Sequence, residues 1–244
     1  MHPFMPPEQI GIHDAEKIVS EIKEQNDIVR SFYALGVVSI KGSILDADAD
    51  ILIAGNRDPF SIKMEITHSW GKPILYILIK EGRLNVLSFQ ENMAYTCTFT
   101  PEALSIFLSG FKLDQKMIWA ILSGRPPVMP YESVRVSGPD RISLTDDKGI
   151  EIEAIYLPFK GSLPKKVAFP EQSLDIFYSE LKEEIGIPYA GKIKISGKKI
   201  ERDLALEIKT ISFNASIPEQ IFTLEIPSSY KTVHLDDIRE DYGK

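Results

Sequence analysis

The sequence has 244 residues, of which 43% are apolar, so it is long enough to enclose a substantial core in one domain or two. Its 28 basic and 35 acidic side chains give a net charge of −7, which argues against binding to nucleic-acid phosphates. Cys97 is the single cysteine, which excludes an intramolecular disulfide.

The first segment, residues 1–13, is rich in proline and is expected to form an extended lead. Apolar residues then recur at helical spacing from Ala15 to Val29, which predicts a helix over about residues 14–31 that Asp14 caps. No run approaches the roughly 18 to 20 apolar residues needed to cross a bilayer, and the start lacks the pattern of a signal peptide. We therefore expect a soluble chain, which is either cytoplasmic or an exported protein whose signal and anchor have been removed.

From residue 32 to residue 99 the apolar period changes to two. Ile62, Met64 and Ile66 alternate with polar residues, which predicts a strand with one solvated face. Residues 73–80 are apolar on both faces, which predicts a central strand beneath a covering element. Turn signals divide this region into about six strands and indicate an antiparallel meander.

Two apolar segments interrupt the strand pattern, and each ends in a glycine. Residues 101–110 and 113–124 are predicted to form short helices. Their apolar side chains, together with one between the segments, are Leu104, Phe107, Leu108, Phe111, Ile118 and Trp119. Such helices are too apolar to face water, so we place them on the concave face of the preceding sheet.

The second half returns to strands, predicted over residues 131–137, 141–145, 151–157, 165–169, 191–196 and 202–213. Residues 173–185 fit both a helix and a strand, with the strand favoured, and the acidic end, residues 236–244, is expected to be flexible. Because no repeat and no long linker divides the chain, residues 1–244 are predicted to form one mainly β domain of α+β type.

Motifs for catalysis and for metal binding are missing from the sequence. His2, His13, His68 and His234 are scattered, and the run from Asp46 to Asp50 lacks the glycine and glutamate of a calcium loop. No glycine-rich phosphate loop or G-x-S-x-G motif is present. We therefore predict no catalytic residue, no metal and no cofactor, and an enzyme with an unrecognised carboxylate site is the least favoured alternative.

One turn carries an unexpected side chain. Trp70 lies among the polar and small residues of the turn 67–72. It either folds back onto the core or protrudes, and in the second case about 200 Å² of apolar surface at ~25 cal/mol per Å² would favour a membrane or a partner by several kcal/mol.

Three short motifs in this order resemble the LolB family of outer-membrane lipoproteins, which receive other lipoproteins from the carrier LolA. They are SFYALGV at residues 31–37, HSWGKP at residues 68–73 and WAILSGRP at residues 119–126. The resemblance extends over about residues 15–127. The acylated N-terminal cysteine of that family has no counterpart here.

The resemblance implies an incomplete antiparallel barrel whose short helices cover or plug an apolar lumen. It implies that this lumen binds lipid or the acyl chains of a lipoprotein, that a LolA-like carrier is a candidate partner, and that the protein works at the periplasmic face of the outer membrane through a lipid anchor that has been removed. Trp70 would insert into a membrane or partner. The implied ligand-binding residues are Ile62, Met64, Ile66, Tyr76, Leu104, Phe107, Leu108, Phe111, Ile118 and Trp119. A periplasmic scaffold or assembly lipoprotein with the same fold and no transferred ligand is the alternative.

Overall fold

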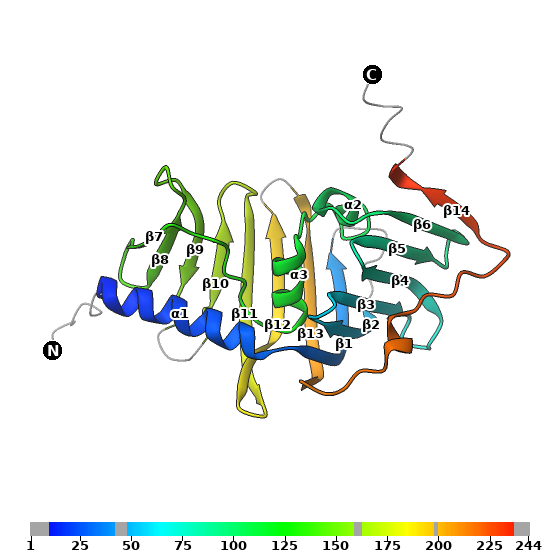
Figure 1. The fold of residues 1–244 in the computed structure, drawn as a ribbon, viewed down its shortest axis with the longest axis horizontal. Coiled ribbons are helices and arrows are strands. Elements are labelled where there is room, and N and C mark those ends of the chain that lie inside the picture. Colours follow the sequence, from blue (N-terminus) through cyan, green and yellow to red (C-terminus); the bar gives the residue numbers. More distant parts are fainter. Residues whose placement is uncertain (1–9, 42–47, 159–162, 198–199, 237–244) are drawn as a thin grey trace, which may run out of the picture.

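A computed structural model of the chain describes residues 10–41, 48–158, 163–197 and 200–236, and these form one continuous sheet with helices on its faces (Figure 1). The first strands are β1 (Ser31–Lys41), β2 (Ala49–Asn56), β3 (Ser61–Thr67), β4 (Pro73–Lys80), β5 (Arg83–Ser88), β6 (Met93–Thr98) and β7 (Ser133–Val136). The remaining strands are β8 (Arg141–Thr145), β9 (Glu151–Tyr156), β10 (Lys166–Phe169), β11 (Leu174–Glu184), β12 (Ile187–Gly197), β13 (Ile200–Phe213) and β14 (Lys231–His234). The helices are α1 (Ile12–Ile28), α2 (Pro101–Ser105), α3 (Gln115–Leu122) and the 3₁₀ turn η1 (Glu219–Phe222).

Two antiparallel meanders join side by side to form the sheet. The strand order is β14-β6-β5-β4-β3-β2-β1-β13-β12-β11-β10-β9-β8-β7, so β1 pairs with β13 where the two meanders meet. The strands β3 to β6 are turned strongly relative to β8 to β13, as expected for the accumulated twist of a wide sheet (Figure 1). In the described part of the chain the two outermost strands, β7 and β14, do not pair, and the curved sheet is not closed into a barrel.

The concave face carries α1 and α3, which fill it with apolar side chains (Figure 1). In α1 the residues Ala15, Val19 and Ile22 recur at helical spacing and are buried against the sheet. Asp114 is the N-cap of α3, and its side chain accepts a hydrogen bond from the Met117 amide at 2.8 Å. All residues of α3 from Met117 to Leu122 are buried. The predicted mainly β fold with helices on the concave face is confirmed.

The outer face of β2 to β4 is covered by the chain that follows β13. Phe222 of η1 packs on Ala54 and Leu78 in a small second core. This segment then supplies β14, which pairs in parallel with β6 and occupies that edge of the sheet. The prediction that β4 lies under a covering element is therefore confirmed, and the cover comes from the end of the chain.

One local expectation is wrong, one is confirmed, and others lie partly outside the described residues. The predicted cap at Asp14 is wrong, because α1 starts two residues earlier with Gly11 as its N-cap and Asp14 lies in the first turn. The ambiguous residues 173–185 form strand β11, paired on both sides with β10 and β12. The extended lead predicted over residues 1–13 is wrong at Ile12 and His13, which belong to α1, and its residues 1–9 lie outside the described residues, as do Asp46 and residues 237–244. Among the described residues no helix is long and apolar enough to span a membrane.

Candidate functional site

The apolar interior predicted from β3 lies on the concave face. Ile62 and Met64 are buried, Ile66 is half-buried, and all three belong to or pack against the main core. Their partners across the ladder are Ile79, Ile77 and Leu75 of β4, so the two strands present one continuous apolar surface.

The helices fill this interior. Leu104 of α2, Ile118 of α3 and Phe111 between the two helices are almost fully buried. Trp119 of α3 packs edge-on against Phe32, with ring centroids 4.9 Å apart. Phe107 and Leu108, in the turn after α2, pack against the same core, where the Phe107 ring lies 5.3 Å from that of Tyr95. In this conformation the predicted lumen is occupied by the protein's own side chains.

Tyr76 does not join this interior. It lies opposite Glu65 across the ladder, on the outer face of β4, and its ring packs on Phe89 at 4.7 Å, with Tyr230 of the covering segment beyond. Because residues 73–80 are apolar on both faces, their pattern could not tell which face is inward. The expectation that Tyr76 lines the lumen is therefore corrected.

Trp70 protrudes from the turn between β3 and β4. Its side chain is 72% exposed and stacks on His68 with ring centroids 4.2 Å apart. The turn is closed by hydrogen bonds from the His68 amide to the Lys72 carbonyl and from the Gly71 amide to the His68 carbonyl, and Gly71 has a positive φ of 85°. The structure decides between the two alternatives for this residue in favour of the exposed one.

An apolar cavity of about 120 Å³ lies beneath this turn, and we call it the turn hollow. Its lining residues are Val38, Asp48, Ala49, Ile66, His68, Ile74, Leu75, Phe107, Leu108 and Leu204. His68 therefore connects the exposed Trp70 to the hollow, and Phe107 and Leu108, which pack against the core, form part of its lining. The sequence-predicted residues Ile66, Phe107, Leu108 and Trp70 thus meet at one end of the sheet.

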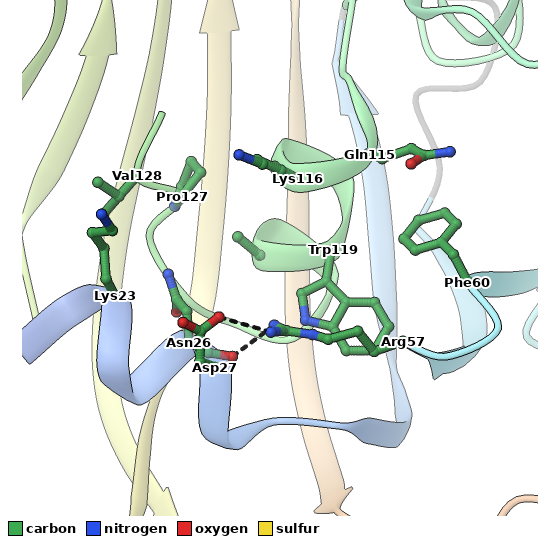
Figure 2. A pocket seen from close by; sticks show the side chains of 11 residues that line it. Lys23, Asn26, Asp27, Arg57, Phe60, Gln115, Lys116, Trp119, Pro127 and Val128 are labelled. Carbon is green, nitrogen blue, oxygen red and sulfur yellow. Dashed lines mark hydrogen bonds and ion pairs between the residues drawn. The ribbon is translucent and has the colours of Figure 1, made fainter. Parts of the chain in front are cut away.

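A second cavity, of about 380 Å³, opens at the other end of β2 and β3, and we call it the basic hollow (Figure 2). It is lined by Lys23, Asn26, Asp27, Arg57, Phe60, Gln115, Lys116, Trp119, Ala120, Pro127 and Val128. Its polar residues come from α1, the turn between β2 and β3, and α3. The sequence does not reveal this hollow, because no two of its three cationic residues are neighbours in the chain.

Two buried charged residues lie behind the helices. The Arg125 side chain is 1% exposed and donates hydrogen bonds to Asn26 Oδ1, the Pro188 carbonyl and Gln25 Oε1, and its burial together with the nearby Arg57 lowers its pKa to about 10. Glu153 is fully buried, and this burial raises its pKa to about 8, although the hydrogen bond from the Met129 amide acts in the opposite direction.

No group of three or more histidine, cysteine, aspartate or glutamate side chains that could hold a metal ion occurs among the described residues. The turn hollow is lined mainly by apolar side chains, and the basic hollow is lined by three cationic side chains and one carboxylate.

No protein-family model matches the sequence, and no curated protein matches it either. Solved structures do match the fold over most of the chain. A putative outer membrane lipoprotein-sorting protein domain from Vibrio parahaemolyticus matches with a TM-score of 0.57 at 10% identity, covering 87% of this chain and 97% of that one. A DUF1329 family protein from Desulfovibrio piger matches with a TM-score of 0.55 at 11% identity, with the same coverage.

A LolA superfamily protein from Nitrosomonas europaea also matches, with a TM-score of 0.50 at 14% identity, covering 84% of this chain and 97% of that one. These likenesses concern the fold alone. The chain shares its fold with these structures: a curved, open antiparallel sheet carries helices on its concave face.

Proposed function

We propose that the protein binds lipid or the acyl chains of a lipoprotein in its apolar interior and helps to receive or insert lipoproteins at the outer membrane. The observation that carries this proposal is the position of the exposed Trp70, next to His68 at the wall of the turn hollow. A side chain suited to a membrane interface thus lies beside an apolar hollow. The resemblance of three sequence motifs to the LolB family and the LolA-type fold support the same function.

Acyl binding requires the turn after α2 to move. Binding sites for small molecules usually measure about 300–1,000 Å³, and the turn hollow is smaller than that. Its lining includes Phe107 and Leu108, which follow a helix of five residues, and the neighbouring Ile106 is 60% exposed. Each buried methylene contributes ~0.8 kcal/mol, so an acyl chain can replace these side chains against the core without any catalytic group.

Filling the turn hollow tests this route. Leu108→Trp should reduce binding of a triacylated lipopeptide at least tenfold, because the larger side chain occupies the space through which the acyl chain enters. Native mass spectrometry of the protein after incubation with the lipopeptide measures the bound fraction. Leu181→Trp, at a residue that is 52% exposed on β11, is the matched control and should bind normally. A wild-type protein that takes up no acyl chain would contradict the proposal.

Trp70 is proposed as the membrane contact. About 150 Å² of exposed ring surface at ~25 cal/mol per Å² is worth ~4 kcal/mol on insertion. Trp70→Glu should therefore weaken binding to phosphatidylcholine vesicles, measured by co-sedimentation, at least tenfold and abolish transfer of a lipoprotein to them. The melting temperature of the Trp70→Glu variant should equal that of the wild type, because the Trp70 side chain is exposed. Ile150→Glu, at another exposed turn, should bind vesicles like the wild type. A large fall in stability for Trp70→Glu would instead identify Trp70 as a packing residue.

One observation favours the alternative of a periplasmic scaffold or assembly lipoprotein without a transferred ligand. Leu104, Phe111 and Trp119 fill the interior and already cover the apolar surface of the sheet. A protein that never opens would show the same packing. The lipopeptide experiment separates the two functions, since a scaffold takes up no acyl chain while keeping the fold.

The proposed place of action is the periplasmic face of the outer membrane, with a LolA-like carrier as the donor of lipoprotein. The likeness to a lipoprotein-sorting domain and to a LolA superfamily protein supports this part of the proposal. Incubating the protein with a LolA-like carrier loaded with lipopeptide tests it, and the lipopeptide is expected to move to this protein.

A further inference from the structure

The basic hollow concentrates positive charge on an acidic protein. Lys23, Arg57 and Lys116 line it against the single carboxylate Asp27, although the whole chain has a net charge of −7. Among the described residues neither Lys23 nor Lys116 forms an ion pair, and Lys23 lies 5.2 Å from the centroid of the Tyr131 ring. Such an arrangement favours an anion inside the hollow.

Arg57 is held in place at the wall of the hollow. Its guanidinium donates to Asp27 Oδ1 at 2.9 Å and to the Asn26 carbonyl at 2.7 Å, and it lies 5.2 Å from the centroid of the Trp119 ring. These contacts use two of the five N–H groups that an arginine carries. Figure 2 shows the guanidinium beside the indole ring, between α1 and α3.

Two buried side chains, Trp119 in the wall of the hollow and the nearby Arg125, each lack one kind of partner. The Trp119 Nε1–H is buried with no hydrogen-bond acceptor in the described part of the chain. Arg125 is buried with its hydrogen bonds directed only to amide and carbonyl oxygens, so no described carboxylate neutralises its charge. Buried donors and charges normally have partners, and an anion that accepts hydrogen bonds would suit both of these groups.

We propose that the basic hollow binds a phosphate group, either free or in the headgroup of a lipid. An anion with several oxygens can accept from Arg57, while Lys23 and Lys116 on other sides of the hollow attract it and its charge offsets that of the nearby Arg125. A volume of about 380 Å³ accommodates a phosphate with a small organic substituent. The site lies at the opposite end of β2 and β3 from the turn hollow, so it is separate from the proposed acyl entrance.

The test uses Trp119 as its own reporter. The chain has two tryptophans, so Trp119 is the sole tryptophan of a Trp70→Phe variant, whose substituted side chain is exposed and remote from the basic hollow. This variant is titrated with sodium phosphate, with monomeric dihexanoyl phosphatidylglycerol, and with sodium chloride at matched ionic strength. We expect a saturable change in Trp119 emission with a phosphate probe and none with chloride. Tighter binding of the lipid indicates a headgroup site, and equal binding indicates a free phosphate site.

Removing the lysines should weaken that response. In the same background, Lys23→Gln/Lys116→Gln should raise the apparent dissociation constant at least roughly tenfold, because each lysine supplies a charge-assisted contact. Both side chains are exposed, so the fold is expected to persist, and Arg57→Gln is a second variant with the same expected loss. Lys112→Gln, whose lysine pairs with Glu102 at 3.2 Å, removes the same charge nearby and should bind normally.

An equal response to chloride, no response to either phosphate probe, or unchanged binding in the double lysine variant would overturn the proposal. The titration with sodium phosphate involves no acyl chain. A negative result there therefore does not contradict the proposed lipid binding, and a negative result in the lipopeptide experiment does not contradict the phosphate site.

Discussion

Glu153 is a fully buried carboxyl with an incomplete set of partners. Its Oε2 accepts from the Met129 amide at 2.8 Å, while Oε1 has no partner among the described residues, and the buried hydroxyl of Tyr178 also lacks one. Burial raises the pKa of Glu153 to about 8. The pKa of Tyr178 is raised well above its ordinary value, mainly by burial and to a smaller extent by the negative charge of Glu153. The folded protein therefore holds a proton on Glu153 near neutral pH.

The stability of the protein should consequently fall as the pH rises from about 5 to about 8. In this window the unfolded chain has lost the Glu153 proton, whereas the folded chain still holds it. The stabilisation is therefore complete below the pKa that Glu153 has in the unfolded chain, and it is lost as the pH rises through the pKa that Glu153 has in the folded protein. Glu153→Gln removes this dependence. Between pH 5 and pH 8 the free energy of unfolding of the wild type should fall by about 1–4 kcal/mol relative to that of the variant, as measured by urea unfolding. Glu171→Gln, at an exposed residue, is the control, and parallel curves for wild type and Glu153→Gln would contradict the explanation.

The pairing of β1 with β13 connects the two meanders of the sheet. Its register shifts between Leu35 and Gly36, and an ideal Cβ added at Gly36 would lie 2.2 Å from the Glu207 carbonyl oxygen. The close approach of two backbones thus requires a glycine in the motif SFYALGV, which explains that residue in physical terms.

Gly36→Ala should destabilise the protein by at least about 1–3 kcal/mol, because the added methyl group collides with backbone and the central pairing must shift. Thermal unfolding followed by circular dichroism measures the change. Gly11→Ala is the comparison, since its added Cβ would meet only the Asp14 side chain at 3.1 Å. A Gly36→Ala protein with the wild-type melting temperature would show that the two strands can separate there without cost.

The whole molecule has apolar packing on both faces of β2 to β4. The main core fills the concave face, and the segment after β13 covers the outer face through Phe222 before it forms β14 along β6. The end of the chain thus covers a surface and occupies a sheet edge that would otherwise be open to pairing with other strands.

Phe222→Ala should release this cover and cost about 2–4 kcal/mol, as is usual for truncating a buried aromatic residue. Hydrogen exchange of the β6 amides should also become faster, because β14 depends on the same segment for its position. Ile226→Ala, at a residue that is 46% exposed in that segment, should change neither quantity measurably. Unchanged exchange in β6 with a normal loss of stability would show that β14 is held independently of Phe222.

The period of the apolar residues was sufficient to predict most strands and both apolar helices, because burial on one face leaves a direct signature in the sequence. The pattern placed Ile62, Met64 and Ile66 correctly on one face. It misplaced Tyr76, because in a strand that is apolar on both faces the sequence does not indicate which face points inward. It did not reveal β14, whose residues Lys231 to His234 are mostly exposed and depend on the edge of β6 for pairing.

By itself the sequence determined the fold class, the apolar interior and the unusual position of Trp70 in a polar turn, since these follow from local patterns of burial and turn chemistry. Only the tertiary structure decided that Trp70 protrudes, that helices fill the interior, and that Lys23, Arg57 and Lys116 line one hollow. Those outcomes depend on contacts between segments far apart in the chain, and no local pattern of residues records such contacts.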